Sequence, residues 1–185
     1  DVGGRLASAL AADGHEVLAL RRSTAALPGV RMIQADVTRP ATLQLPAGLD
    51  VVVTALSPGE SGAEAYRRVY VDGTRALQQA LAGQSLLRQF WGSSTSVYGE
   101  QQGDWIDEDT PAQAASATAQ ALLDAEALVM AGVWPGTIVR FGGLYGPGRH
   151  RLLRWVESGR PVQAEPPSWS NRIHVEDAAG LLRHL

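Results

Sequence analysis

Two residue types that enzymes often use are missing from this sequence of 185 residues. It has no cysteine, which excludes disulfide scaffolds, cysteine-ligated zinc and thiol catalysis. It also has no lysine, because all 16 basic residues are arginines, so a Schiff-base or other lysine mechanism is excluded for this segment. No apolar run approaches the roughly 18 residues of a membrane span, and no signal peptide is recognised at the start. Together these absences favour a cytoplasmic protein.

The composition is that of an ordinary globular domain. Hydrophobic residues make up 45% and charged residues 19%, which is too apolar for a disordered chain. The net charge is −3, so the chain lacks the basic footprint of a nucleic-acid-binding protein, and its five tryptophans form no periodic stacking platform. The four histidines are dispersed without metal-ligand spacing. We therefore expect a small-molecule substrate, and no nucleic acid, membrane or metal partner.

Short apolar runs alternate along the chain with longer helical patterns. The runs rich in valine and isoleucine are typical of parallel strands that are buried on both faces. The alternation predicts an α/β fold with a doubly wound parallel sheet. The predicted strands are 16–20, 31–34, 50–55, 88–92 and 136–140, and the predicted helices are 4–13, 63–82, 114–131, 150–157 and 176–185.

The first residues lead us to expect that a strand precedes them. Residues 1–6 (DVGGRL) resemble the second half of a glycine-rich turn that enters a helix, and such a helix follows a strand. We expect that strand about ten residues upstream, a strand length plus the turn. The first strand of a doubly wound sheet is central, so a chain without it leaves two strand edges unpaired.

Six segments, each weak alone but specific in this order, resemble the NAD-dependent epimerase/dehydratase family of extended short-chain dehydrogenases/reductases. The resemblance implies a Rossmann-type fold, a nicotinamide dinucleotide, a binding domain over residues 1–160 and an incomplete substrate-side region over 161–185. It also implies a homodimer through the helices predicted at 63–82 and 114–131. The six segments are 1–6 (DVGGRL), 71–75 (VDGTR), 92–99 (GSSTSVYG), 107–111 (DEDTP), 140–148 (RFGGLYGPG) and 172–177 (RIHVED).

The end of the strand predicted at 16–20 bears on the choice of cofactor. Gly3 would be the last glycine of the turn that approaches a pyrophosphate, the one that permits close helix–strand packing. An ordinary helix start near glycines is the alternative interpretation. About 20 residues later an NAD site carries an acid for the ribose, but this chain has Arg21 and Arg22 there. Guanidinium groups bind a 2′-phosphate, so the sequence favours NADP over NAD. Two solvated surface arginines are the alternative interpretation.

Other positions are expected near the cofactor on the resemblance. Asp36 and its neighbour match the family's adenine-contacting pair, although Asp36 has an alternative as a cap. Small residues after the strand at 50–55 let the backbone approach a dinucleotide, although they also simply end strands. The implied positions are Asp36, Val37, Ala55, Leu56, Ser57, Gly142 and Gly143.

The match to the family breaks at the active site. Members use a Ser or Thr with a Tyr-x-x-x-Lys pair, in which the lysine lowers the pKa of the tyrosine. Ser94 matches the hydroxyl position, but with Glu126 as anchor the tyrosine position falls at Thr118 and the lysine position at Leu122. No lysine exists in the chain, so slipping the alignment does not restore the pair. The chain is therefore expected to be an atypical member.

Two tyrosines could replace the missing pair. Tyr98 and Tyr145 each follow a strand, where ligands of open sheets bind, and packing is the alternative role for both. His174 and the acidic residues at 104–109 have structural interpretations that we favour over catalysis. The expected function is an NADP-dependent epimerase-like oxidoreductase acting on a small polar or sugar-like substrate. The alternative is a dinucleotide-binding sensor or scaffold without turnover.

Overall fold

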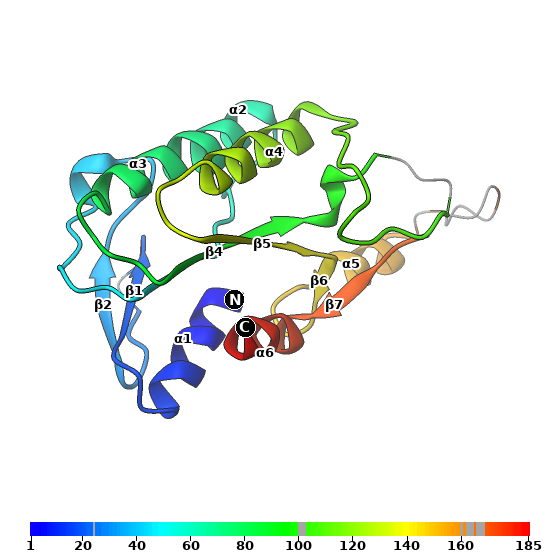
Figure 1. Cartoon of the computed structure of the whole chain (residues 1–185). Coiled ribbons are helices and arrows are strands. Elements are labelled where there is room, and N and C mark those ends of the chain that lie inside the picture. Colours follow the sequence, from blue (N-terminus) through cyan, green and yellow to red (C-terminus); the bar gives the residue numbers. More distant parts are fainter. Residues whose placement is uncertain (24, 100–102, 160, 162–164, 166–168) are drawn as a thin grey trace.

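The computed structural model describes residues 1–23, 25–99, 103–159, 161, 165 and 169–185 (Figure 1). The strands are β1 (Val17–Arg21), β2 (Val30–Gln34), β3 (Val51–Thr54), β4 (Arg88–Ser94), β5 (Gly136–Phe141), β6 (Gly143–Tyr145) and β7 (Arg172–His174). The helices are α1 (Val2–Ala12), α2 (Ala63–Tyr66), α3 (Gly73–Ala80), α4 (Ala117–Met130), α5 (Arg151–Glu157) and α6 (Val175–His184). Shorter helical turns lie at η1 (Pro40–Thr42), η2 (Arg67–Asp72) and η3 (Thr95–Val97).

All the strand pairs are parallel among the described residues. β1 pairs with β2, β4 lies between β3 and β5, and β6 pairs with β7. In the central sheet Phe90 pairs with Val53 on one side and with Thr137 on the other. The α/β fold with parallel strands is thus confirmed, and the predicted strands are found with ends shifted by one or two residues.

Within the described part of the chain, β1 and β3 each have one hydrogen-bonded neighbour. Each exposes a large apolar side chain, with Leu20 36% and Val51 47% exposed. The strand expected upstream remains a prediction, as does the division into 1–160 and 161–185, whose boundary falls beside residues outside the described ranges.

Helices cover the central sheet on both faces (Figure 1). α2, α3 and α4 lie on one face, where Trp91, Val97, Leu122 and Val129 form a buried cluster. α1 and α6 lie on the other face and pack with Val139 and Phe141. The alternation of side chains along β4 and β5 explains both cores, because successive residues point to opposite faces of a sheet.

The helix predicted at 63–82 is continuous but contains a π-helical turn. α2 runs into η2, which is π-helical, and α3 continues to Ala80. Gly73 lies where the helix meets the segment after β2, since an added Cβ would come within 2.8 Å of Val37 Cγ2. A glycine at this position therefore permits the close approach of the helix to this segment.

The sequence missed the pair β6 and β7. Each strand has three residues, which is too short for an alternation of apolar and polar side chains to be recognised. Their register places Tyr145 beside His174. Most of residues 161–170, where the predicted substrate-side region begins, lie outside the described residues. Among the described helices none has the length and apolar character that crossing a membrane requires.

Candidate functional site

A cleft of about 590 Å³, here the main cleft, opens at the carboxyl ends of β3, β4 and β5. Its walls come from the start of α1, the segments after β3 and β5, the end of β4, and α5. Ligands of doubly wound sheets bind at this edge, outside the carboxyl ends of the strands. The topology therefore makes the main cleft the candidate site.

The start of α1 forms one wall of the main cleft. Asp1, Val2 and Gly3 line it, and an added Cβ on Gly3 would lie 3.5 Å from the Cβ of Ala55. The first N–H groups of a helix lack partners within it and carry partial positive charge, which suits an anionic ligand. One of them, the N–H of Val2, donates to the Asp1 carboxylate at 2.9 Å. Gly3 is where the sequence predicted it.

The segment after β3 continues this wall. Ala55, Leu56 and Ser57 all line the main cleft. β4 runs close beside them, because an added Cβ on Gly92 would lie 3.2 Å from the carbonyl oxygen of Thr54. Small residues here keep the backbone accessible from the cleft. The arrangement fits a dinucleotide that passes over the strand ends.

The two serines at the end of β4 have different hydrogen-bond partners. Ser94 lines the main cleft, and its Oγ caps the start of η3 by accepting from the Ser96 N–H at 3.2 Å. Ser93 also lines the cleft, but its Oγ donates to Glu126 Oε1 at 2.5 Å. Ser94 therefore presents its hydroxyl beside the cleft, whereas the Ser93 hydroxyl is bound to a buried carboxylate.

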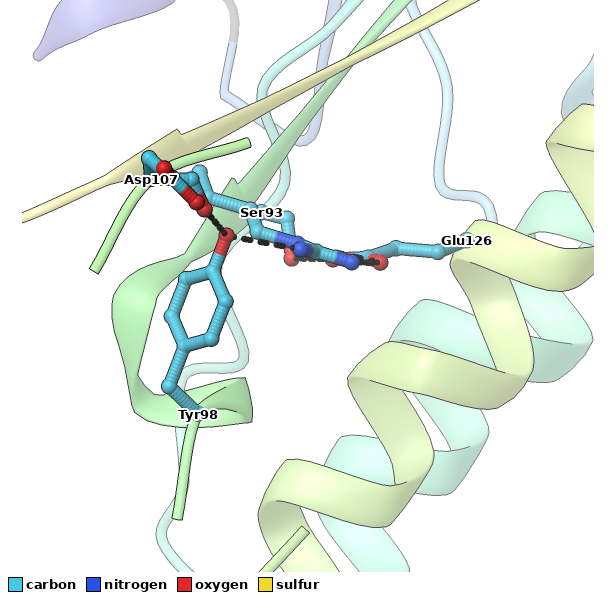
Figure 2. A network of polar contacts seen from close by, with 5 residues as sticks. Ser93, Tyr98, Asp107 and Glu126 are labelled. Carbon is cyan, nitrogen blue, oxygen red and sulfur yellow. Dashed lines mark hydrogen bonds and ion pairs between the residues drawn. The ribbon is translucent and has the colours of Figure 1, made fainter. Parts of the chain in front are cut away.

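Figure 2 shows the polar network that holds this carboxylate. Glu126 is 5% exposed and accepts from Arg140 through Nε at 3.1 Å and Nη2 at 2.6 Å. Arg140 Nη1 then donates to Tyr98 Oη at 2.8 Å, and Tyr98 Oη donates to the carbonyl of Asp107 at 3.2 Å. The network thus joins α4, β4, β5 and the segment after η3.

The charge of Arg140 is fixed by its partners. Its hydrogen bonds to Glu126 raise the pKa of the guanidinium above its ordinary value, although partial burial opposes this rise. Arg140 also lies over the Tyr98 ring, with Cζ 4.9 Å from the ring centroid. The arginine therefore remains a cation, which donates hydrogen bonds but cannot act as a general acid.

The structure places Tyr98 away from the predicted position in the cleft. Tyr98 is absent from the described residues that line the main cleft, and its hydroxyl is engaged by Arg140 and Asp107. The proton of the phenol is therefore committed to the Asp107 carbonyl in this arrangement. The structural role that the sequence left open for Tyr98 therefore has direct support.

Tyr145 does line the main cleft. It is 46% exposed, and its ring meets His174 edge to face with 5.2 Å between centroids. Gly142 and Gly143 also line the cleft, but both approach β7 closely, since added Cβ atoms would lie 3.2 Å from Asn171 and 3.0 Å from Arg172. These glycines thus serve strand packing as well as the cleft wall.

A second, smaller hollow of about 260 Å³ lies beside the end of β1, and we name it the arginine hollow. Three guanidinium groups line it, those of Arg22, Arg39 and Arg68. Arg68 is paired with Glu60 at 3.2 Å, while Arg22 lies 3.6 Å from the Cβ position of Gly59. The hollow is the place where the sequence predicted a phosphate-binding arginine.

Only one of the two predicted arginines lines this hollow among the described residues. Arg22 does so, whereas Arg21 donates to the carbonyl of Ala25 at 3.4 Å. Successive residues of an extended chain point in opposite directions, which separates the two. Likewise Asp36 lines the arginine hollow, whereas its neighbour Val37 packs on the helix and lines neither hollow.

Asp36 is held by local hydrogen bonds. Its Oδ1 accepts from the Thr38 N–H at 2.9 Å and from Thr38 Oγ1 at 2.8 Å. Burial alone would raise the pKa of this carboxyl, but the Thr38 hydrogen bonds and the charges of Arg22 and Arg39 together lower it. The turn-capping role left open for Asp36 is therefore present, beside any contact with a ligand.

Two other predicted structural roles have direct support. Asp107 caps a turn, because its Oδ1 accepts from the hydroxyl of Thr110 at 2.8 Å, and this bond lowers the pKa of the carboxyl. His174 caps α6 by accepting from the Glu176 N–H at 3.4 Å. Within the described residues no group of three or more acidic or histidine side chains could hold a metal ion.

The sequence missed two tyrosines of the main cleft. Tyr66 and Tyr70 line it together with Leu122, the position aligned with the family's lysine. Burial raises the pKa of Tyr70 to about 12, and its hydroxyl donates to the carbonyl of Leu56 at 3.5 Å. The helical periodicity of residues 63–82 places both tyrosines on one apolar side, and this spacing gives no sign of a cleft.

Comparisons with known proteins agree with this geometry. A protein from a Streptomyces species described as 3-diazoavenalumate denitrifying reductase is 29% identical and is matched by 97% of this chain. A solved structure described as an NAD-dependent epimerase/dehydratase from Methylobacillus flagellatus is 41% identical, with a TM-score of 0.83 over the whole chain. The chain spans 66% of the length of each of these two proteins.

A further solved structure, MoeE5 in complex with UDP-glucuronic acid and NAD, is 26% identical with a TM-score of 0.79. It is matched by 98% of this chain, which covers 67% of its length. These neighbours confirm the resemblance to NAD-dependent epimerase/dehydratases that the six segments indicated. The family model described as NAD(P)H-binding matches residues 1–179, and the chain therefore belongs to this NAD(P)H-binding family.

Proposed function

We propose that this chain binds NADP(H) and belongs to an oxidoreductase that acts on a small polar or sugar-like substrate. The start of α1 and the segment after β3 would hold the dinucleotide, because they combine partial positive charge with small side chains at the ends of the strands. The comparisons support this proposal through an NAD(P)H-binding family match, a relative described as a reductase, and a neighbour in complex with NAD.

The preference for NADP rests on one observation, the arginine hollow beside the end of β1. Three guanidinium groups and two carboxylates line it, those of Asp36 and Glu60. One carboxylate is bound by Thr38 and the other by Arg68. Of the two remaining guanidinium groups, those of Arg22 and Arg39, that of Arg22 lies beside Gly59. A guanidinium forms paired hydrogen bonds with a phosphate, so Arg22 is the residue proposed to bind the 2′-phosphate.

The chemistry is proposed for the far end of the main cleft. A bound nicotinamide supplies or accepts a hydride. Ser94 would orient a hydroxyl or carbonyl oxygen of the substrate, since its side chain lies at the cleft edge. Tyr145 would contribute to the opposite wall, because it lines the same cleft from β6.

The alternative function is a dinucleotide sensor or scaffold without turnover. It is favoured by Leu122, which lines the main cleft at the position aligned with the family's lysine. An apolar side chain at this position can contact a ligand but cannot donate or accept a proton. The alternative predicts nucleotide binding without consumption of a reduced cofactor.

Thermal unfolding with NADPH and with NADH tests the proposal on the complete protein. A ligand at 100 times its Kd stabilises by about 2.7 kcal/mol, and we expect NADPH to give the larger shift at equal concentration. Arg22→Gln should weaken NADPH binding by roughly 10- to 100-fold, the worth of a charge-assisted hydrogen bond, and leave NADH binding unchanged. Arg31→Gln, on an exposed position of β2, is the matched control.

The outcomes separate the possibilities. Equal shifts with both nucleotides, or an equal loss in both arginine variants, would refute the role of Arg22 and leave an NAD-binding protein. No shift with either nucleotide would refute nucleotide binding itself.

A further inference from the structure

The main cleft has an aromatic wall that the family resemblance does not account for. Tyr66 and Tyr70 both line it from the helix that follows β3. Their rings meet edge to face with 5.3 Å between centroids, and Tyr70 meets Trp91 in the same manner at 5.7 Å. Trp91 is fully buried, and its Nε1 donates to Thr74 Oγ1 at 3.1 Å. The stack therefore fixes Tyr66 against a rigid part of the core.

The backbone at this wall is unusual. Tyr66 ends α2, and the next six residues form the π-helical turn η2 before α3 begins. A π-helical turn is rare, replaces the regular α-helical hydrogen bonds and is frequent at functional sites. Here it lies in the segment that carries Val69 and Tyr70 between Tyr66 and the close contact at Gly73. The turn thus sets the direction of the aromatic wall relative to the rest of the helix.

The hydroxyl groups of the four tyrosines differ in their availability. The Tyr98 hydroxyl is hydrogen-bonded to Arg140 and Asp107, as drawn in Figure 2, and Tyr98 does not line the main cleft. The Tyr70 hydroxyl is buried against the Leu56 carbonyl. Tyr66 is half-buried, and no partner of its hydroxyl is found among the described residues. Tyr145 lines the cleft on β6 and is more exposed. Tyr66 thus combines a fixed ring with an available hydroxyl.

The charged side chains next to Tyr66 in the sequence are engaged elsewhere. Arg67 is paired with Asp124 at 3.4 Å and Arg68 with Glu60 at 3.2 Å. Leu122, in the same apolar cluster, is uncharged. Among the described residues the Tyr66 hydroxyl therefore stays available for a hydrogen bond to a substrate oxygen in the main cleft.

We propose that Tyr66 is the catalytic proton donor of this cleft in the reduction of a carbonyl group. The inference rests on the proposed function, because a reduced nicotinamide must supply the hydride. The hydride adds to the carbonyl carbon, the π electron pair moves to the oxygen, and that oxygen takes the proton of the Tyr66 hydroxyl. An alcohol and an oxidised dinucleotide result, and the tyrosinate regains a proton from water. Ser94 holds the same oxygen before transfer.

The first test measures NADPH oxidation by the complete protein with a panel of carbonyl probes. The panel is 4-carboxybenzaldehyde, 9,10-phenanthrenequinone and glyceraldehyde. Tyr66→Phe should lower kcat by about 100-fold or more, the worth of a positioned general acid, with NADPH affinity within about twofold of the parent. Tyr70→Phe removes a hydroxyl from the same helix, and the fall for Tyr66→Phe should exceed the fall for Tyr70→Phe by at least about tenfold.

The second test does not depend on turnover. Protein labelled with carbon-13 at tyrosine Cζ gives a resonance for each of four tyrosines, assigned by single Tyr→Phe variants. NADP⁺ should shift the Tyr66 resonance and leave the Tyr98 resonance in place. A fixed Tyr66 resonance in protein that binds NADP⁺ would show that the hydroxyl does not face the bound nucleotide.

Each remaining outcome is decisive. Equal activity of Tyr66→Phe and the parent would overturn the proposal, and so would NADPH binding without oxidation by any carbonyl of the panel. Failure of NADPH to bind at all would instead contradict the proposed function. A variant with lost activity counts as support only where its NADPH-induced thermal shift matches that of the parent, which excludes a folding defect.

Discussion

Removal of the Arg140 guanidinium is the sharpest test of the network behind the main cleft. In Arg140→Gln the Glu126 carboxylate keeps its hydrogen bond from Ser93 but loses the paired bonds from Nε and Nη2. The carboxylate side chain is 7% exposed, so water cannot replace the missing cation. The variant leaves an unpaired charge in the core.

The expected magnitude follows from this burial. Breaking a buried ion pair by removing one partner costs about 3–5 kcal/mol, whereas an exposed pair contributes about 0.2–1 kcal/mol. The Arg140 side chain is 25% exposed, which places the expected loss near the lower figure, at about 3 kcal/mol. For a domain of this size that corresponds to a fall in Tm of roughly 6–12 °C.

Urea unfolding followed by circular dichroism measures the loss, with an unchanged slope required for a two-state comparison. Arg88→Gln is the matched control, because Arg88 lies on the neighbouring strand, is exposed and donates to Thr137 Oγ1 at 2.9 Å. Its loss should stay within about 1 kcal/mol.

The double variant Arg140→Gln with Glu126→Gln decides the cause. If the orphaned charge is responsible, neutralising Glu126 restores part of the lost stability, and the double variant unfolds at higher urea than Arg140→Gln alone. Additive losses from the two substitutions would refute the reasoning. A loss below about 1 kcal/mol for Arg140→Gln would refute it as well, because the pair would then behave as a surface pair.

Two further predictions concern Gly73 and Asp36. Gly73→Ala should destabilise the protein by about 1–3 kcal/mol in a thermal melt, because the new Cβ would lie 2.8 Å from Val37 Cγ2. Alanine otherwise favours a helix, so a stabilised variant would contradict this expectation. Asp36→Ala should lose stability that is fully present above the ordinary carboxyl pKa and disappears as the pH falls through the lowered pKa of Asp36. Urea unfolding at pH 7 and pH 3 checks the sign, and an equal loss at both pH values would count against it.

The fold was predictable because its main strands are continuous apolar runs. Residues 51–54 (VVVT) and 136–141 (GTIVRF) have the length and the β-branched content of buried parallel strands. β6 and β7 lack both properties. Their pairing depends on the close approach of Gly142 and Gly143 to Asn171 and Arg172, which lie nearly 30 positions away and cannot be read from a local pattern.

The site was predictable where a motif fixes the backbone and unpredictable where distant side chains decide. Ser94 follows from the segment 92–99, and the structure places it at the cleft. Tyr98 belongs to the same segment, yet its hydroxyl turns to Arg140, which lies 42 positions along the chain. The difference between Arg21 and Arg22 is of a third kind, because it depends on which residue is the last one in β1.

Tyr66 shows why periodicity alone could not find the whole cleft. Sequence periodicity places Tyr66, Val69, Tyr70 and Leu77 on one apolar side of a helix, and a core face requires no more than that. The same side forms core along α3 and cleft wall along α2 and η2, because the cleft opens at the carboxyl ends of the strands and this helix begins after the carboxyl end of β3. Where an apolar helix face is not packed against the sheet, it must contact a ligand or solvent. The tyrosines at that end, with apolar rings and polar hydroxyl groups, suit a surface that is covered in part.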